Sequence, residues 1–152
     1  MSRTALRRTA ALCVCVAAAP VALAGAGTGP AQISITDRQT KDVVVDQGVH
    51  GPSPGDLEII HQSLYNRRVT PKPIGTADIL CTTLVAKRRM CSGTYSLPKG
   101  TIVTSGAIGS RLLYELAIVG GTELYDNARG SLVVTTTSLN PRREVLVFRL
   151  SG

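Results

Sequence analysis

The chain is 152 residues long, which suits a single domain, and it carries a formal net charge of +7. Aromatic residues make up only 3% of it, so the basic residues are not accompanied by an aromatic platform for stacking bases, and we expect no nucleic-acid partner. The histidines are His50 and His61, and no CxxC or HxxxH spacing occurs, so we expect neither a metal site nor a cofactor.

Residues 1–24 have the order of a secretory signal peptide. Three arginines in residues 1–8 form a positive start, and residues 9–24 are uncharged and rich in Ala, Val and Leu. Small residues at 22–24 and 24–26 predict cleavage after Ala24 or Ala26. Cleavage lowers the net charge to +4, because three of the 17 basic residues leave and all ten acidic residues remain.

A retained membrane anchor is the alternative interpretation of this segment. Its apolar run is short compared with the roughly 20 residues that a membrane span needs, and it contains Pro20. We therefore expect a secreted, extracellular protein without stable membrane insertion after cleavage. A flexible leader over residues 25–31 precedes one domain over residues 32–152.

Beyond the leader, turn residues recur at short intervals and β-branched runs lie between them, which predicts strands. No window of adequate length shows the 3.6-residue apolar stripe of a helix. The expected strands are Gln32 to Asp37, Val43 to Asp46, Asp56 to Tyr65, Ile74 to Val85, Met90 to Leu97, Thr101 to Ser105, Leu112 to Val119, Ala128 to Thr137 and Glu144 to Leu150.

About eight strands with short connections cannot remain an open flat sheet, because its edges and apolar face would be exposed. We therefore expect an all-β fold, either a sandwich or a closed barrel. An eight-stranded antiparallel up-and-down barrel leaves an interior that can hold one small ligand.

Cys81 and Cys91 remain after cleavage, and an even pair in an oxidising compartment predicts a disulfide. If Cys81 faces Cys91 across a hairpin, Ile79 faces Gly93, and these side chains share one apolar face with Tyr95. The disulfide is then expected on the inner side of the sheet or near the barrel mouth. A redox-active pair is the alternative to this structural role.

Three basic clusters lie where strands are expected to end: Arg67-Arg68, Lys87-Arg88-Arg89 and Arg142-Arg143. The simplest interpretation places all three in solvated turns, where basic side chains act as gatekeepers at sheet ends. Residues 86–89 are accordingly expected to cap the hairpin that joins the two cysteine strands.

The most specific motif runs from residue 115 to residue 130, with the sequence ELAIVGGTELYDNARG. It resembles the signature of plant dirigent proteins, in which a strand ends in Gly-Gly-Thr-Gly and Ala-Arg-Gly opens the next strand. The matching residues here are Gly120, Gly121, Thr122, Ala128, Arg129 and Gly130. Earlier segments are similar to the related allene oxide cyclases, notably Gly55-Asp56-Leu57 before Leu64-Tyr65, Ile74-Gly75 before Cys81, and Gly100-Thr101-Ile102 before Gly106.

The resemblance covers residues 32–150 and implies the allene oxide cyclase-like barrel, in which eight antiparallel strands surround an apolar cavity. It implies a small hydrophobic molecule as the partner and a homotrimer as the assembly. Two positions depart from the family. Glu123 stands where the second Gly of Gly-Thr-Gly usually lies, and Gln62 stands where the cyclases carry a pocket Asn.

The glycines of this motif predict sharp changes of chain direction. We expect positive φ at Gly120-Gly121, where the chain leaves a strand abruptly, and a bend or bulge at Gly130. Arg129 is a candidate for holding the loop by hydrogen bonds to backbone carbonyls.

On the strand over residues 56–65, the cyclase-like register points Glu58, Ile60, Gln62 and Leu64 inward. A buried Glu58 is the candidate catalytic residue, since desolvation disfavours its charged form and suits acid-base work. The alternative, which we favour, is a rim carboxylate that is solvated or paired with arginine. On the opposite face, His61 has no carboxylate partner that the sequence can place.

Three further residues are candidates for contact with a ligand: Ile79, Tyr95 and Tyr114. Each tyrosine either presents its hydroxyl to the ligand or simply fills the barrel. Asp78 is either an outer-face residue or a pocket carboxylate, and the hairpin register, in which it alternates with Ile79, favours the outer face.

Three functional hypotheses follow. The first is a dirigent-like barrel that holds and orients a small apolar molecule without chemistry of its own. The second is an isomerase or cyclase of a polyunsaturated or polyketide-like substrate, which gains rate by holding a folded conformer in a dry pocket. The third is an extracellular structural module whose barrel is filled by its own side chains. We favour the first.

Overall fold

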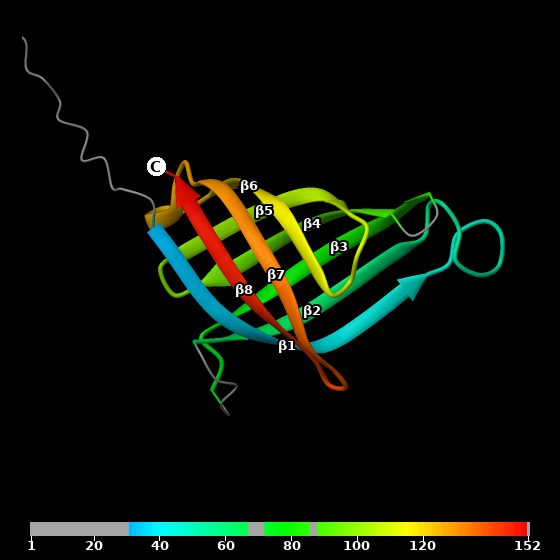
Figure 1. Cartoon of the computed structure of the whole chain (residues 1–152), viewed down its shortest axis with the longest axis horizontal. Coiled ribbons are helices and arrows are strands. Elements are labelled where there is room, and N and C mark those ends of the chain that lie inside the picture. Colours follow the sequence, from blue (N-terminus) through cyan, green and yellow to red (C-terminus); the bar gives the residue numbers. More distant parts are fainter. Residues whose placement is uncertain (1–30, 67–71, 86–87, 152) are drawn as a thin grey trace, which may run out of the picture.

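A computed structural model describes residues 31–66, 72–85 and 88–151, which form a closed barrel of eight antiparallel strands joined in chain order (Figure 1). The expected signal peptide, the leader up to residue 30 and Arg67-Arg68 lie outside the described residues. The elements are β1 (Ala31–Val45), β2 (Leu57–Tyr65), β3 (Gly75–Val85), β4 (Arg88–Leu97), β5 (Gly100–Ile108), β6 (Leu113–Gly121), the 3-10 turn η1 (Glu123–Tyr125), β7 (Arg129–Leu139) and β8 (Arg142–Ser151).

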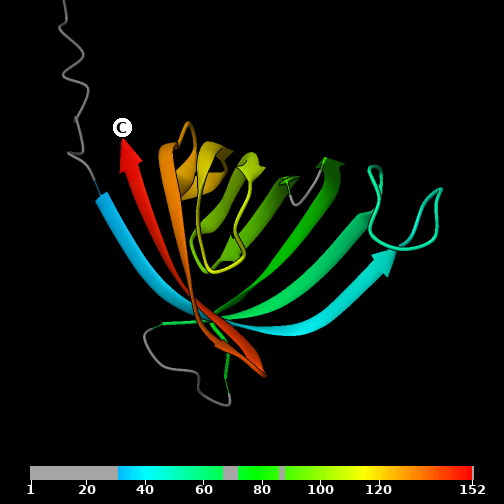
Figure 2. The same cartoon turned by 45° about the vertical axis from the view of Figure 1, so that its right-hand side comes forward.

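The barrel closes because β1 pairs with strands on both of its sides. It lies antiparallel to β2 and to β8, with Ile33 opposite Phe148 in the second ladder (Figure 1). The two strands expected over residues 32–37 and 43–46 are one strand. This strand is strongly curved and carries a register shift between Gln39 and Lys41 (Figure 2). The barrel expectation is confirmed, and the sandwich is excluded.

The hairpin of β3 and β4 has the predicted register. Cys81 lies opposite Cys91 and forms the disulfide, and Ile79 lies opposite Gly93. Both cysteines are buried, so the disulfide lies on the inner face of the barrel. Arg89 belongs to β4 rather than to a hairpin cap, and its side chain is buried.

Large apolar side chains fill the end of the barrel where β2–β3, β4–β5 and β6–β7 are joined, which we call the closed half. Tyr95 packs edge-to-face on Phe148, with ring centroids 5.2 Å apart. Fully buried neighbours complete this core: Leu64, Ile102, Leu132 and Leu146. Because strand side chains alternate, each strand contributes every second residue to the filling.

The opposite end, which we call the mouth half, carries the β1–β2, β3–β4, β5–β6 and β7–β8 connections. The β1–β2 loop projects beyond the strands at the right of Figure 1. Asp56 holds this loop in shape, because its carboxylate accepts the backbone N–H of Gln47 at 2.9 Å and that of Ser53 at 2.6 Å. These hydrogen bonds lower the pKa of Asp56.

Candidate functional site

Charged side chains gather in the mouth half of the barrel. They are Asp37 on β1, Glu58 on β2, Arg89 on β4, Arg111 in the β5–β6 loop, and Arg142 and Glu144 on β8. The three carboxyl groups are buried, with residue exposures of 0% for Asp37, 6% for Glu58 and 2% for Glu144. Buried charges are costly unless they are paired, so their partners define the site.

The outer cluster joins one carboxylate to two guanidinium groups. Arg89 contacts Glu58 directly, and Arg111 donates from both of its terminal nitrogens to the two oxygens of Glu58, each at 3.1 Å. The side chains of Glu58 and Arg89 are 8% and 10% exposed, whereas that of Arg111 is 55% exposed. The cluster therefore carries one surplus positive charge at the mouth.

The inner cluster is centred on Glu144. Arg142 donates to Glu144 Oε1 from Nε at 2.9 Å and from Nη2 at 2.6 Å, and Thr136 donates to the same oxygen at 3.1 Å. Gln62 Nε2 donates to Oε2 at 3.1 Å. The backbone N–H of Glu144 donates to Asp37 Oδ1 at 2.9 Å, which brings a second carboxyl group against the first.

This arrangement places two buried carboxyl groups beside one guanidinium group. Burial and the charge of Glu144 raise the pKa of Asp37 from 3.8 to about 8, against the lowering effect of the backbone hydrogen bond from Glu144 and the charge of Arg142. Like charges this close cannot both ionise without cost, so the pair holds one proton at neutral pH. A carboxylate beside a protonated carboxyl group can both accept and return a proton.

Tyr114 on β6 completes the polar lining. Burial and the charge of Glu144 raise the pKa of its phenol, so the hydroxyl remains protonated at neutral pH and can donate a hydrogen bond.

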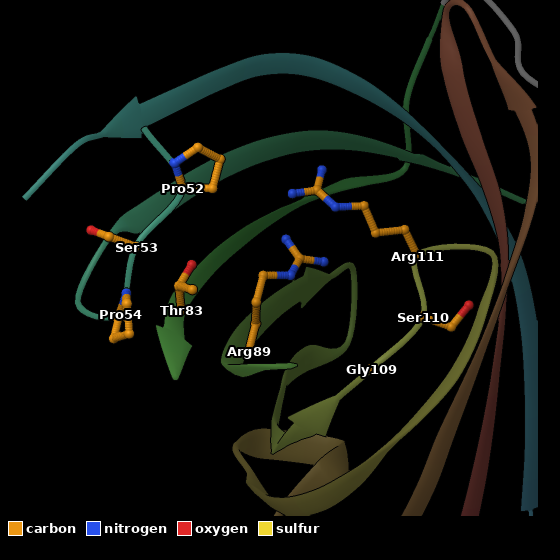
Figure 3. A pocket seen from close by; sticks show the side chains of 8 residues that line it. All are labelled: Pro52, Ser53, Pro54, Thr83, Arg89, Gly109, Ser110 and Arg111. Atoms are coloured by element: carbon orange, nitrogen blue, oxygen red, sulfur yellow. The ribbon is translucent and has the colours of Figure 1, made fainter. Parts of the chain in front are cut away.

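Two cavities adjoin the charged residues. The lumen cavity has a volume of about 10 Å³, room for about one water molecule, and Gln62, Tyr114, Arg142 and Glu144 are part of its wall. A larger pocket of about 370 Å³ lies at the mouth, between the β1–β2 loop and the β5–β6 loop (Figure 3). Arg89 lines both cavities, so its side chain stands between them.

The residues expected to contact a ligand divide between the two halves of the barrel. Ile60, Gln62, Ile79 and Tyr114 line the lumen cavity together with the disulfide. Leu64 is fully buried in the closed half. Tyr95 lies there too and fills the barrel as a packing residue.

The solvated-turn interpretation is wrong for Arg89 and Arg142. Both side chains enter the mouth half, where Glu58 and Glu144 pair with them. Glu58 is paired with arginine, as the favoured alternative expected, but in a buried position rather than a solvated one. Arg88 is exposed.

The glycine-rich motif also differs from expectation. Neither Gly120 nor Gly121 has positive φ; Gly121 is needed because a Cβ there would clash with the carbonyl oxygen of Tyr125. Positive φ occurs instead at Glu123 (56°), Asn127 (59°) and Gly130 (132°). The β7–β8 register is continuous through Gly130, so no bulge lies there.

The remaining motif residues lie around η1. Thr122 caps the turn from an extended conformation and accepts the backbone N–H of Thr101 through its hydroxyl at 3.1 Å. Ala128 is buried. Arg129 donates to the carbonyl oxygen of the adjacent residue, Ala128, at 2.8 Å. This hydrogen bond holds only the end of the loop next to β7.

The sequence interpretation missed the inner carboxyl pair. Asp37 continues the inward alternation of Ile33 and Ile35, and Glu144 precedes Leu146 and Phe148 at the same period of two. The signal in the sequence was a charged residue at an inward position of a strand whose other inward residues are apolar.

On the outer face, His61 has a partner that the sequence could not place. Its Nδ1 lies 2.6 Å from Asp78 Oδ1, and both side chains are substantially exposed. Asp78 is thus on the outer face, as its register predicted. Within the ranges that the structure describes, no three His, Cys, Asp or Glu residues are arranged to hold a metal ion. The described part of the chain also contains no helix long and apolar enough to cross a membrane.

Comparisons with known proteins were made for the sequence and for the fold. No family model and no curated protein matches the sequence. Among solved structures, the chain is similar to a pyocyanin demethylase, at 23% identity and a TM-score of 0.66 over 78% of this chain and 100% of that one. It is also similar to a pterocarpan synthase dirigent protein, at 18% identity and a TM-score of 0.62 over 83% and 99% of the two chains.

A third similar structure is an exo-specific intermolecular Diels-Alderase, at 15% identity and a TM-score of 0.63 over 82% of this chain and 99% of that one. The chain has the fold of the dirigent-like barrels. At these identities the similarity is one of fold, and function has to be argued from the site itself.

Proposed function

We propose that this dirigent-like barrel is an acid-base isomerase or cyclase of a small molecule that enters at the mouth and presents its reacting end to Glu144. The observation that carries the proposal is the contact of two buried acidic residues, Asp37 and Glu144, beside the lumen cavity. The raised pKa of Asp37 leads us to expect that the pair holds one proton at neutral pH. Glu144 is the catalytic residue of the pair because it lines the cavity, whereas Asp37 lies behind it and stores the proton.

The proposed step conserves protons. The Glu144 carboxylate accepts a proton from a carbon of the substrate, and the pair returns a proton at another position, so a double bond moves or a ring closes without any oxidant. Gln62 and Arg142 orient the Glu144 carboxylate, and the Tyr114 hydroxyl donates to an oxygen that gains charge.

The division of the barrel bears on the size of the substrate. The closed half is filled by apolar side chains, and the lumen cavity has room for about one water molecule. A substrate therefore has most of its body in the mouth pocket, whose volume of about 370 Å³ is within the range of small-molecule sites. Only its reacting end extends past Arg89.

A barrel that orients a molecule without chemistry remains the second candidate. The mouth pocket supports it equally, since two proline rings and two guanidinium groups can hold a molecule in one orientation. Under this hypothesis the Glu144 carboxylate is a hydrogen-bond acceptor only.

Deuterium uptake from D2O separates these candidates without knowledge of the product. The purified protein is incubated with a panel of unsaturated ketones and phenols, each with and without a carboxylate group, and mass spectrometry records the exchange of carbon-bound hydrogen. We expect Glu144→Gln to reduce the exchange rate by about 100-fold or more, since an amide cannot accept the proton. We also expect the wild-type rate to fall as the pH rises through about 8, where Asp37 loses its proton.

Glu115→Gln is the matched control, because Glu115 is an exposed carboxylate on the outer face of β6. If the wild type exchanges hydrogen and Glu144→Gln does so at the same rate, the assignment of Glu144 as the catalytic residue is wrong. Retention of a compound by the wild type without any exchange would favour the orienting barrel.

A further inference from the structure

The mouth pocket has walls of two kinds. Its lining residues are Pro52, Ser53, Pro54, Thr83, Arg89, Gly109, Ser110 and Arg111. Figure 3 shows the two proline rings on the loop that faces the arginines, and both guanidinium groups directed into the space between the loops. An apolar surface opposite a cationic one suits a molecule with an apolar body and an anionic group.

The cationic wall has unused capacity for an anion. Glu58 is the one carboxylate among the described residues that pairs with Arg89 and Arg111, so one positive charge remains uncompensated within the cluster. Arg111 is half exposed and can change partners at little cost, whereas Arg89 is nearly buried. A guanidinium group recognises a carboxylate through two parallel hydrogen bonds, as Arg111 now does with Glu58.

The same ion pairs separate the pocket from the lumen. Arg89 forms part of the wall of both cavities, and its contact with Glu58 holds its side chain in that position. With about 10 Å³ beyond it, a substrate cannot reach Glu144 until Arg89 moves. An incoming carboxylate offers Arg111 an alternative partner, which loosens the cluster while Arg89 keeps the buried Glu58 paired.

The loop that carries the prolines is built to stay in place during this exchange. Asp56 accepts hydrogen bonds from the backbone and the hydroxyl of Ser53, at 2.6 and 3.1 Å, and the Ser53 hydroxyl also donates to the carbonyl of Gln47 at 3.0 Å. Any opening of the pocket toward the lumen therefore has to come from the side of the arginines.

We infer that the mouth pocket binds the carboxylate of a small organic acid, which takes Arg111 from Glu58, leaves the buried Glu58 paired with Arg89, and so frees this pair to move aside and open the way to the lumen. The role of this opening, to admit a substrate to Glu144, rests on the proposed function. The class of substrate, a small organic acid, is new. Two carboxylates, that of the ligand and that of Glu58, compete for the guanidinium group of Arg111. Removing this guanidinium group should therefore weaken binding of the acid, and removing the Glu58 carboxylate should strengthen it.

Benzoate and benzamide are suitable probes, because they have the same shape and differ in charge. Each is titrated into the full mature chain, labelled for NMR, at low salt. We expect benzoate to shift the side-chain N–H signals of Arg111 and Arg89, and to shift the methyl signals of Ile60 and Ile79 in the lumen along the same saturation curve. Benzamide should bind at least about tenfold more weakly, since it lacks the charge.

Two substitutions should change benzoate affinity in opposite directions. Arg111→Gln should weaken binding about tenfold or more, because it removes the more accessible guanidinium group. Glu58→Gln should strengthen binding severalfold, because it removes the competing carboxylate. Arg149→Gln is the control of equal charge change, since Arg149 is exposed on β8, and it should leave the affinity unchanged.

Equal binding of benzoate and benzamide, or unchanged benzoate affinity in Arg111→Gln, would overturn the anion site. Shifts confined to the two arginines would overturn the opening of the lumen. Should Glu58→Gln not fold, the wild-type titration and Arg111→Gln still decide the question. Benzoate binding requires no turnover, so the two proposals can fail separately. Absence of benzoate binding with deuterium exchange that depends on Glu144 would overturn the anion site alone. Benzoate binding without deuterium exchange that depends on Glu144 would overturn the acid-base function alone.

Discussion

At the scale of single residues, Asp37 has an unusual environment for a carboxyl group. One of its oxygens accepts the backbone N–H of Glu144, and no described residue donates a hydrogen bond to the other. The side chain is fully buried beside a second carboxyl group. A carboxyl group in this position is stable as the neutral acid, which explains why its pKa rises to about 8.

This raised pKa makes Asp37 a source of pH-dependent instability. Below about pH 4 the carboxyl is protonated in both the folded and the unfolded chain, so it contributes nothing. Between pH 3.8 and about 8 only the unfolded chain releases the proton, so the free energy of unfolding falls as the pH rises. Asn has the shape of the neutral acid and no proton to release.

We therefore expect Asp37→Asn to be more stable than the wild type, by an amount that grows from pH 4 to pH 8 and reaches the order of a few kcal/mol. Urea unfolding of both proteins at several pH values measures the difference. A stability difference that does not change with pH would show that Asp37 ionises normally in the folded protein.

At the scale of the elements, the connection between β6 and β7 is tightly constrained. A Cβ at Gly121 would clash with the carbonyl of Tyr125, and Gly130 at the start of β7 has a φ of 132° and leaves no room for a Cβ beside the carbonyl of Arg149. Between them, Glu123 opens η1 with a φ of 56°, a left-handed conformation that favours glycine. The motif resemblance placed a glycine at this position.

Glu123→Gly should accordingly raise the free energy of unfolding, by roughly 0.5–1 kcal/mol, since relief of backbone strain exceeds the added entropy of the unfolded chain. Thermal and urea unfolding measure the change. Glu115→Gly in β6 is the control and should destabilise by about 1 kcal/mol, because its backbone is that of an ordinary strand. Equal losses in both variants would refute the strain at Glu123.

At the scale of the whole molecule, the apolar residues that stabilise the barrel and the charged residues of the candidate site lie at opposite ends. The closed half is an apolar core, whereas the mouth half buries several charges, which costs free energy even when they are paired. The closed half has to offset that cost. Phe148 contributes to it with a fully buried ring that packs on Tyr95.

Phe148→Ala should lower the free energy of unfolding by about 3–5 kcal/mol, because it leaves a cavity in a core that has little freedom to collapse. Phe148→Leu should lose less than about 1.5 kcal/mol, because it conserves most of the volume. Benzoate binding at the mouth should persist in both folded variants. A loss below about 1 kcal/mol in Phe148→Ala would mean that the closed half is not tightly packed.

Local sequence patterns were sufficient for much of this fold. Short β-branched runs between turn residues located most of the strands, and the pairing of Cys81 with Cys91 predicted the register of a whole hairpin. These features depend on neighbours along the chain or across one hairpin, so they can be read without the rest of the molecule. The cyclase-like register that the family resemblance implies correctly directed Glu58 and Gln62 inward.

Only the tertiary structure decided which charges belong to the site. Glu58 meets Arg89 and Arg111 across 31 and 53 residues of sequence, and Asp37 meets Glu144 across 107. Alternation tells which residues share a face of one strand, but barrel closure determines what stands opposite them. A charged residue is stable inside only when its partner arrives from a distant strand. For this reason Arg89 and Arg142 resembled solvated turn residues until the barrel was closed.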